Sequence, residues 1–90
     1  MITCKEYLEL SDAFEPSDDE TFAVLVREAI QLTGMSLRDM GHEFEVMPST
    51  ISRWATGAVK PMPGMQRMTV AMLRRHITKI HTSTLNEETK

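Results

Sequence analysis

The residues whose types and spacing could support recognition chemistry lie between Ser36 and Trp54. In the second half of this segment, small hydroxyl side chains and one arginine, Arg53, surround two apolar positions, Ile51 and Trp54. Hydroxyl groups both donate and accept hydrogen bonds, and a guanidinium group donates in a planar fork that fits the edge of guanine. The pattern therefore predicts a short helix that can present hydrogen-bonding groups to the major groove of DNA.

The same segment is predicted to form two helices joined by a tight turn. Ser36 is a good N-cap for a helix from Leu37 to about Phe44. Pro48 suits the first position of a second helix, to about Thr56, because its missing N–H needs no partner there. The apolar spacing turns one side of each helix inward, with a small residue where the helices cross closely. We expect the motif core to comprise Leu37, Met40, Gly41, Phe44, Val46, Ile51 and Trp54.

Two further helices are predicted before this motif. Residues 3–6 match a capping box, and the helix that follows places apolar residues at i, i+3 and i+7 until Pro16 ends the segment. A second capping box at residues 17–20 opens a helix with an apolar stripe over residues 22–30, which Gly34 terminates. No segment shows the strict alternation of a half-buried strand, so the chain is predicted to be all-α.

A last helix is predicted from near Gly64 to about His81, followed by a flexible tail over residues 82–90. Its apolar residues spread over more than half of the circumference at about 100° per residue, which is wider than a core stripe requires. Two explanations stay open. The helix is sandwiched between the core and the N-terminal helix, or it forms the seam of a dimer, where methionines adapt well to a contact. The candidate seam residues are Met65, Met68, Met72, Ile77 and Ile80.

Length and composition limit the class of protein. Ninety residues are enough for one domain with a small core, and 41% hydrophobic with 26% charged residues is typical of a globular chain. The single cysteine, Cys4, excludes an intrachain disulfide and favours a reducing compartment. No apolar run approaches the roughly 18 residues of a membrane span, and no basic-then-apolar signal pattern opens the chain. We therefore expect a cytoplasmic protein with no membrane partner.

Charge is unevenly distributed along the chain. Residues 1–47 carry a net charge of −8, whereas residues 48–86 hold six basic residues and no acidic one. The basic segment begins at the second helix of the motif, which favours a DNA-facing surface over residues that only solvate a helix. The acidic N-terminal helix could also fold over this basic surface and weaken non-specific binding.

Residues from Ser36 to about Leu73 resemble the helix-turn-helix domain of the Cro and lambda-type repressor family. The likeness rests on Ser36-Leu37-Arg38-Asp39-Met40-Gly41, on Pro48-Ser49-Thr50-Ile51-Ser52-Arg53-Trp54 and on Gly57-Ala58-Val59-Lys60-Pro61. It implies a compact all-α, lambda-repressor-like domain of four to five helices with a central helix-turn-helix. The predicted organisation is an accessory helix over residues 1–16, a DNA-binding domain over 17–81 with its motif at 36–54, and the tail over 82–90.

The resemblance also implies which side chains meet DNA. Base edges would be contacted by Pro48, Ser49, Thr50 and Arg53. Phosphates would be contacted by Arg38, Ser52, Thr56 and Lys60. Arg53 can bind guanine through two hydrogen bonds, and the Thr50 methyl can touch a thymine methyl. The alternative for Arg53 is a solvent-exposed side chain or an ion pair with Glu45, and for Lys60 it is an ordinary loop lysine.

Two positions depart from the family pattern. Glu45 stands where a glycine is common, and a side chain at this turn position is expected to need a positive φ. Met47 replaces the usual serine or threonine cap, with a loss of roughly 1 kcal/mol of capping. Glu43 and Glu45 also place negative charge near the expected DNA surface.

No catalytic or metal-binding pattern competes with this interpretation. His42-Glu43 begins like a zinc-protease motif, but position 46 is valine where the second histidine would stand. His76 and His81 are five residues apart, which does not align them on one helical face, and a lone cysteine completes no metal cluster. We expect no enzymatic activity, no metal and no cofactor.

We therefore expect a sequence-specific binder of double-stranded DNA. The predicted role is a phage- or plasmid-type transcriptional repressor that binds an inverted repeat as a homodimer, associated with the nucleoid of a bacterial or phage-infected cell. Two alternatives remain open. One is a helix-turn-helix module for protein contact, such as an antitoxin or adaptor, for which loss of DNA binding is harmless. The other is an activator whose acidic N-terminal region contacts RNA polymerase or another protein, a contact that survives removal of Arg53.

Overall fold

The computed structural model describes residues 2–18 and 20–88, with side chains described as far as residue 83. Over these residues the chain is all-α, as the sequence predicts, and no strand is present. The five helices are α1 (Cys4–Asp12), α2 (Thr21–Thr33), α3 (Leu37–Phe44), α4 (Pro48–Thr56) and α5 (Pro63–Glu88). The bounds of α3 and α4 confirm the predicted helix-turn-helix.

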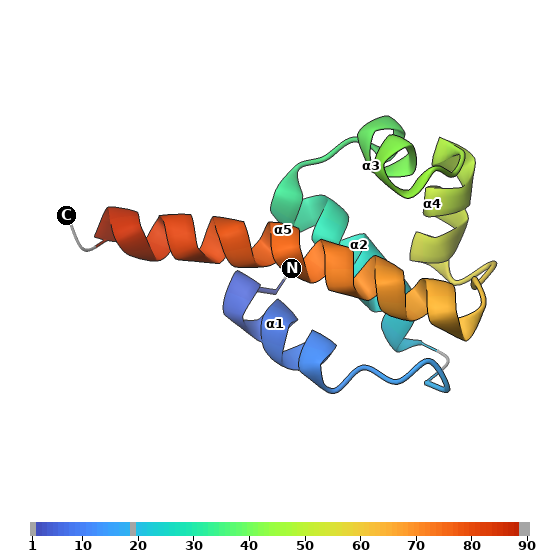
Figure 1. Ribbon diagram of the computed structural model, residues 1–90, viewed down its shortest axis with the longest axis horizontal. Coiled ribbons are helices and arrows are strands. Elements are labelled where there is room, and N and C mark those ends of the chain that lie inside the picture. The colour runs from blue at the N-terminus through green and yellow to red at the C-terminus, as the bar shows by residue number, and fades with distance from the viewer. Residues whose placement is uncertain (1, 19, 89–90) are drawn as a thin grey trace.

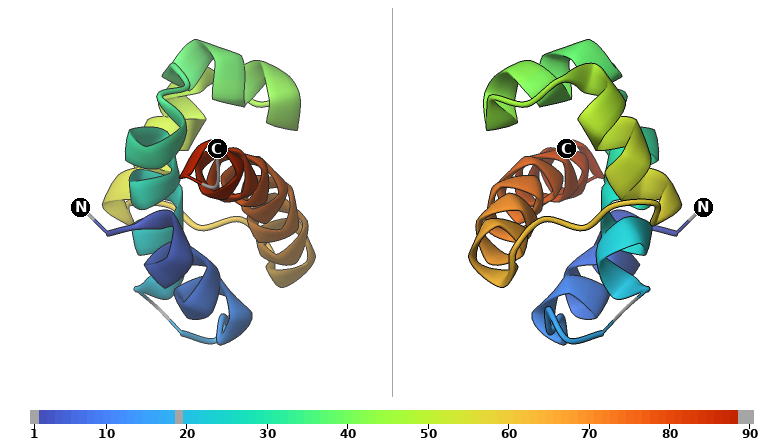
Figure 2. Two further views of the ribbon diagram at one scale, coloured as in Figure 1. Left: turned by 90° about the vertical axis from the view of Figure 1, so that its left-hand side faces the viewer. Right: turned by 90° about the vertical axis from the view of Figure 1, so that its right-hand side faces the viewer.

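The long helix α5 runs through the middle of the molecule and separates two parts of the chain (Figure 1). Helices α1 and α2 both pack against α5, and α4 packs against α2 and α3. The views at right angles show α1 on one side of α5 and α3 on the other (Figure 2). The α3–α4 pair therefore forms one end of the molecule, and the N-terminal helix lies at the opposite side.

A single apolar core joins all five helices. Its large, fully buried members come from every helix and include Tyr7, Phe22, Leu25, Met40, Ile51, Leu73 and Ile77. Trp54 lies among the aromatic residues of this core, with its ring edge-on to Phe22 at a centroid distance of 5.7 Å and tilted against Phe44 at 6.5 Å. Burial of large apolar side chains is the main stabilising force in a domain of this size.

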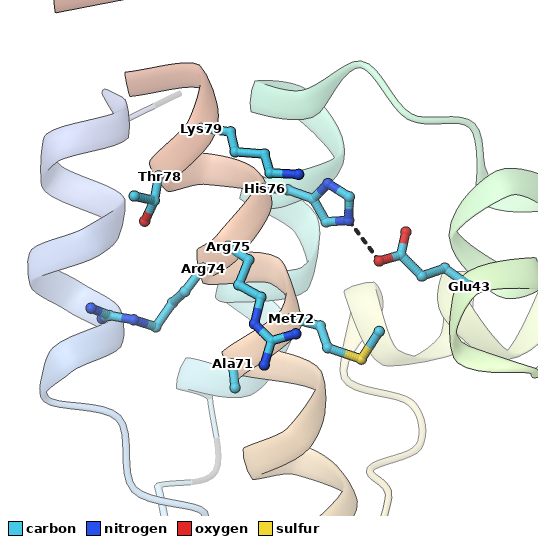
Figure 3. Close-up of a pocket in the computed structure, with 8 residues that line it drawn as sticks. All are labelled: Glu43, Ala71, Met72, Arg74, Arg75, His76, Thr78 and Lys79. Atoms are coloured by element: carbon cyan, nitrogen blue, oxygen red, sulfur yellow. Dashed lines mark hydrogen bonds and ion pairs between the residues drawn. The ribbon is translucent and has the colours of Figure 1, made fainter. Parts of the chain in front are cut away.

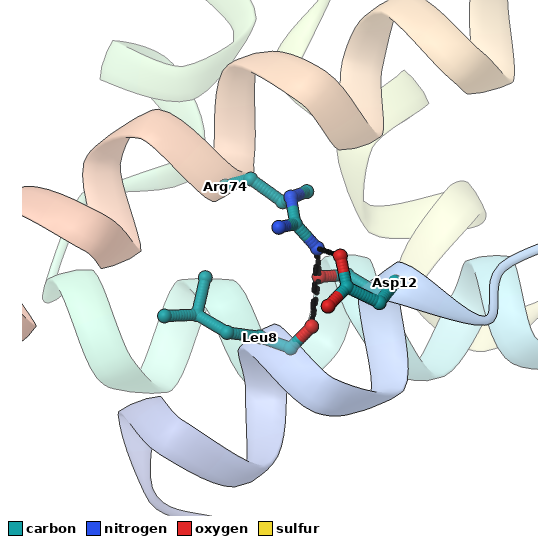
Figure 4. A network of polar contacts seen from close by, with 4 residues as sticks. Leu8, Asp12 and Arg74 are labelled. Atoms are coloured by element: carbon teal, nitrogen blue, oxygen red, sulfur yellow. Dashed lines mark hydrogen bonds and ion pairs between the residues drawn. The ribbon is translucent and has the colours of Figure 1, made fainter.

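Two residues, Tyr7 and Arg74, fasten helix α1 to the rest of the molecule through polar contacts. The Tyr7 hydroxyl donates a hydrogen bond of 2.8 Å to the backbone oxygen of Leu25 on α2. Arg74 of α5 donates from Nη1 to the oxygen of Leu8 at 3.0 Å and forms an ion pair of 2.8 Å with Asp12 (Figure 4). These carbonyl and carboxylate groups lie near the C-terminal end of α1, where a cation is favourable.

This placement narrows one of the possibilities raised by the charge pattern, because α1 pairs with Arg74 of the basic segment but does not cover α4. Helix α1 packs on α5 and α2, on the side of α5 opposite to α3, so it does not fold over α4 (Figure 2). The physical reason is that Tyr7 supplies a fully buried side chain to the common core. Residues 1–16 thus share one core with residues 17–81, even though their sequence roles were predicted separately.

The two predicted capping boxes have different outcomes. At Thr3 the box is complete, because Glu6 N donates to Thr3 Oγ1 at 3.1 Å and Thr3 N donates to Glu6 Oε1 at 3.0 Å. The backbone hydrogen bond from Thr3 lowers the pKa of Glu6. The second box is wrong, because α2 begins only at Thr21 and its N-cap, Glu20, makes no side-chain capping bond.

The start of α2 is instead organised by Asp18. Its carboxylate accepts hydrogen bonds from the Thr21 hydroxyl at 2.5 Å and from Glu20 N at 3.4 Å. The bond from Thr21 is the main cause that lowers the pKa of Asp18. An aspartate can thus satisfy backbone and hydroxyl donors just ahead of a helix without occupying the N-cap position itself.

Helix α5 is longer than predicted, and its wide apolar surface is partly explained by its contacts with two other helices. It runs from Pro63 to Glu88, so the expected end near His81 is wrong, and residues 82–88 of the expected tail continue the helix. Residues 89 and 90 lie outside the described part of the chain. Contacts with both α1 and α2 support the sandwiched arrangement. No helix within the described residues is long and apolar enough to cross a membrane.

The buried hydrogen bond of Tyr7 leads to a stability prediction. Tyr7→Phe should lower the free energy of unfolding by about 1 kcal/mol near neutral pH, because the hydroxyl loses its carbonyl partner while the ring still fills the core. Urea denaturation followed by the fluorescence of Trp54 measures this change.

The same residue should make stability sensitive to alkaline pH. Burial raises the pKa of Tyr7 in the folded state, so the unfolded chain loses the proton first once the pH exceeds about 10. Stability should therefore fall above that pH more steeply in the wild type than in Tyr7→Phe. Parallel pH profiles of the two proteins would contradict this assignment.

Candidate nucleic-acid interface

The turn between α3 and α4 is held by backbone geometry. Glu45 adopts the left-handed conformation with φ 58°, the only non-glycine residue in the described chain with a positive φ. Its N–H donates to the carbonyl oxygens of Gly41 and His42, and Val46 N donates to Gly41 O at 2.8 Å. The predicted positive φ at Glu45 is confirmed. These bonds close the end of α3 so that the chain can enter α4 at once.

Gly41 allows the turn to fold back onto α3. A Cβ atom at this position would lie 2.6 Å from the carbonyl oxygen of Val46 and 3.3 Å from the nitrogen of Pro48. The first distance is shorter than any relaxed contact, and both neighbours are backbone atoms that cannot rotate away. The need for a small residue is thus confirmed, and the group that requires it is the backbone of the turn.

Helix α4 begins without a side-chain cap. Met47 is its N-cap residue and makes no capping bond, and Pro48 follows at the first helical position, as predicted. The carbonyl of Met47 accepts from Thr50 N at 2.9 Å and from Ile51 N at 3.3 Å. The Met47 side chain is 68% exposed, and the helix ends at Gly57 with φ 82°.

The inward side of the motif matches the prediction. Met40, Gly41, Phe44, Ile51 and Trp54 are buried, and Leu37 and Val46 are partly buried against the same core. Because Ile51 and Trp54 fix one side of α4 in the core, the opposite side of that helix must face outward.

The outward side of α4 exposes two of the four residues predicted to contact bases, together with two of those predicted to contact phosphates. Ser49, Ser52, Arg53 and Thr56 are exposed, while Pro48 and Thr50 are half-buried at its edges. The Arg53 guanidinium makes no hydrogen bond or ion pair with any side chain that the structure describes, so the alternative ion pair with Glu45 is not formed. The Thr56 hydroxyl donates to Arg53 O at 3.1 Å.

Basic residues flank this helix on two sides. Arg38 is exposed on α3 and lines a hollow with His42 and Pro48 beside the start of α4. Lys60 is exposed in the loop after α4, and its positive charge is the last of the causes that lower the pKa of Asp18, after the bond from Thr21. The structure therefore places Lys60 near an acidic group as well as near the end of α4.

His42 is a candidate contact that we did not predict. It is exposed on α3 and contributes to the hollows on both sides of the turn, one with Arg38 and Pro48 and the other with Met47 and Thr50. The sequence could have indicated this residue, because His42 lies four positions after Arg38 and residues four apart share a helix face.

The basic residues of the segment 48–86 do not all belong to this surface. Arg74 points toward α1, and Arg75 and Lys79 line a hollow between α5 and the end of α3 (Figure 3). Glu43 of α3 reaches into the same hollow and contacts His76 Nε2 at 2.6 Å. The carboxylate of Glu43 is therefore turned toward α5, whereas Glu45 is exposed at the turn.

The candidate dimer seam is only partly available for contact with another molecule. Met68 is 49% exposed, and Met65, Met72 and Ile80 are half-buried. Ile77 is fully buried in the core of its own chain, so its inclusion in the seam is wrong. At 100° per residue Ile77 shares a helix face with Leu73 and Val70, which are also buried.

The described residues contain no group of three histidine, cysteine, aspartate or glutamate side chains placed to hold a metal ion. In comparisons with protein-family models, with curated proteins and with solved structures, no significant match to the chain was found. The functional interpretation therefore depends on the residues and geometry of this surface.

The close approach at Gly41 provides a test of the turn. Gly41→Ala should lower the free energy of unfolding by about 1–3 kcal/mol, because the added methyl group overlaps the Val46 carbonyl and the backbone must shift. Thermal unfolding followed by circular dichroism measures the change.

Gly64→Ala is the matched control, because a Cβ at Gly64 meets no atom within 4 Å. This variant should be unchanged or slightly more stable, since alanine favours a helix over glycine. Equal destabilisation of both variants would show that steric contact at Gly41 is not the cause.

Proposed function

We propose that this protein is a sequence-specific binder of double-stranded DNA and a transcriptional repressor that acts by occupying its site. The observation that carries the proposal is the unengaged guanidinium of Arg53 on the outward side of a short helix whose other side is fixed in the core. A rigid helix with an available arginine is suited to binding guanine in the major groove. The proposal includes membership of the Cro and lambda-type repressor family, which the motif resembles.

In this proposal the exposed side of α4 reads base edges. Arg53 binds O6 and N7 of guanine, Ser49 and Thr50 hydrogen-bond to neighbouring bases, and Pro48 makes an apolar contact. Arg38 on α3 and Lys60 after α4 bind phosphates on either side and set the register of the helix. Ser52 is exposed and able to assist, whereas the Thr56 hydroxyl already donates to the backbone.

The arrangement of carboxylates supports this surface as a DNA contact. Two glutamates of the motif were expected near DNA, but Glu43 is turned toward His76 on α5. Glu45 is left as the exposed carboxylate of the turn. Fewer negative groups near the phosphates reduce the electrostatic cost of binding.

A homodimer forms part of the proposal, because one short recognition helix has few contacts and binds weakly. Two copies on an inverted repeat would place their α4 helices about 34 Å apart, or a multiple of that distance. The proposed location is the cytoplasm of a bacterial or phage-infected cell, where such a repressor meets its DNA.

Selection of the protein against random duplex DNA, with Arg53→Ala in parallel, tests this function. A palindromic motif with a guanine in each half-site should be enriched by the wild type. Arg53→Ala should lose the guanine preference and bind the selected site about 5- to 150-fold more weakly, as expected for one bidentate contact worth about 1–3 kcal/mol.

Arg67→Ala is the matched control, because it removes an exposed arginine from α5 with the same change in charge. It should keep the guanine preference. If nothing is enriched even at low salt, where phosphate contacts are strongest, DNA binding is refuted.

A further inference from the structure

A hollow of about 640 Å³ lies between α5 and the end of α3 (Figure 3). Its lining comes from Glu43 of α3 and from seven residues of α5 between positions 71 and 79. Small-molecule sites in proteins have volumes of roughly 300–1,000 Å³, so the hollow is large enough to hold one. None of its lining residues belongs to the set proposed to contact DNA, so the hollow is separate from the DNA-binding surface.

Two basic side chains give the hollow a positively charged edge. Arg75 and Lys79 are exposed and lie four residues apart, which places them on the same face of α5. Neither makes an ion pair with any side chain that the structure describes. Arg74, in contrast, is directed toward α1 and pairs with Asp12 (Figure 3 and Figure 4). Two unpaired cations at one edge favour an anionic group from outside the molecule.

Apolar side chains line the hollow beside these cations. Met72 is half-buried and directed toward the side of α3, and Ala71 precedes it on α5 (Figure 3). Met68 is 49% exposed and lies one turn before Met72 on the same helix face, so it extends the apolar surface. Methionine fits apolar groups of different shapes, because its unbranched side chain has three rotatable bonds. The hollow therefore combines a charged edge with an adaptable apolar lining.

The wall formed by α3 carries a carboxylate that is already engaged. Glu43 Oε1 contacts His76 Nε2 at 2.6 Å, and this contact connects α3 with α5 at the hollow (Figure 3). The described residues include no ion pair from Glu43 to Arg75 or Lys79, so Glu43 does not neutralise the charged edge. Its negative charge opposes an anion in the hollow, so removal of that charge should strengthen anion binding.

We propose that this hollow binds a small organic anion with an apolar body, of the class of alkyl carboxylates and alkyl phosphates. The anionic head lies against Arg75 and Lys79, whose N–H groups donate to its oxygens, and the alkyl chain lies on Met72 and Ala71. The size of the hollow favours a small molecule over a protein partner. Eight residues line it, whereas a stable protein interface takes roughly 20–30 residues on each side.

Titration of the ¹⁵N-labelled protein with sodium octanoate, followed by NMR, tests the site without DNA. Saturable shifts should be largest for the amide signals of Glu43 and residues 71–79. Octyl phosphate carries the second type of head group and should shift the same signals, and the stronger of the two ligands identifies the preferred head. Octanol lacks the charge, and acetate and inorganic phosphate lack the alkyl chain, so each should bind at least about fivefold more weakly than octanoate.

Two variants should change octanoate binding in opposite directions. Arg75→Gln with Lys79→Gln should weaken it about 3- to 10-fold at low salt, because both contacts between opposite charges are lost. Glu43→Gln should strengthen it about 2- to 5-fold, because a repelling charge is removed while the amide can still bond to His76. Lys5→Gln with Arg67→Gln is the matched control, since it removes two exposed basic side chains outside the hollow, and it should bind like the wild type.

Circular dichroism confirms that each variant is folded, and Lys79→Gln alone replaces a double variant that is not. The proposal is overturned if the octanoate shifts do not saturate, if the largest shifts lie elsewhere, or if the variant at Arg75 and Lys79 binds like its control. Equal binding of octanol or of inorganic phosphate would also overturn it, because the charged edge or the apolar lining would then have no role. Shifts at residues 71–79 with duplex DNA but not with octanoate would assign this edge to the DNA backbone.

Discussion

The backbone of the α3–α4 turn passes so close to Gly41 that no side chain can stand between them, and the geometry of the candidate interface depends on this contact. A Cβ there would meet the Val46 carbonyl at 2.6 Å. The close approach lets the end of α3 close on itself through the left-handed Glu45, so that α4 starts after only three residues. The direction of α4, and with it the outward direction of Arg53, follows from that turn and from the burial of Ile51 and Trp54.

Helix α5 provides the support on which both ends of the molecule are assembled. On one side, Arg74 of α5 pairs with Asp12 of α1, and the Tyr7 hydroxyl adds a hydrogen bond to Leu25 of α2. His76 contacts Glu43 on the other side and links α5 directly to α3. A small domain buries little apolar surface. One long helix that packs against neighbours on two sides therefore contributes a large part of its core.

The tertiary structure decides which of the charged residues meet one another and which remain separate. Along the sequence, acidic and basic segments are separated almost completely. In space, some of these charges meet, as Arg74 meets Asp12 and Lys60 influences Asp18, and others remain unpaired on separate surfaces. The basic residues consequently divide between the region of α4 and the flank of α5. A single basic surface, which the linear distribution suggested, is replaced by two separate basic surfaces.

The sequence by itself determined the all-α class, the bounds of α3 and α4 and the inward residues of the motif. Local rules were sufficient at Ser36, Gly34 and Pro48, because caps, a left-handed terminator and an N1 proline act within one helical turn. Those rules failed at residues 17–20, where Asp18 and Thr21 bond to each other and α2 begins later. They also failed at the predicted end of α5 near His81. No glycine or proline follows there to end the helix, and α5 continues to Glu88. Only the tertiary structure decided that Ile77 is internal, that Glu43 turns to His76 and that α1 lies away from α4. These outcomes depend on which residues distant in the chain meet across the core. Helical periodicity shows which residues share a face of one helix, but it does not show which other helix that face meets.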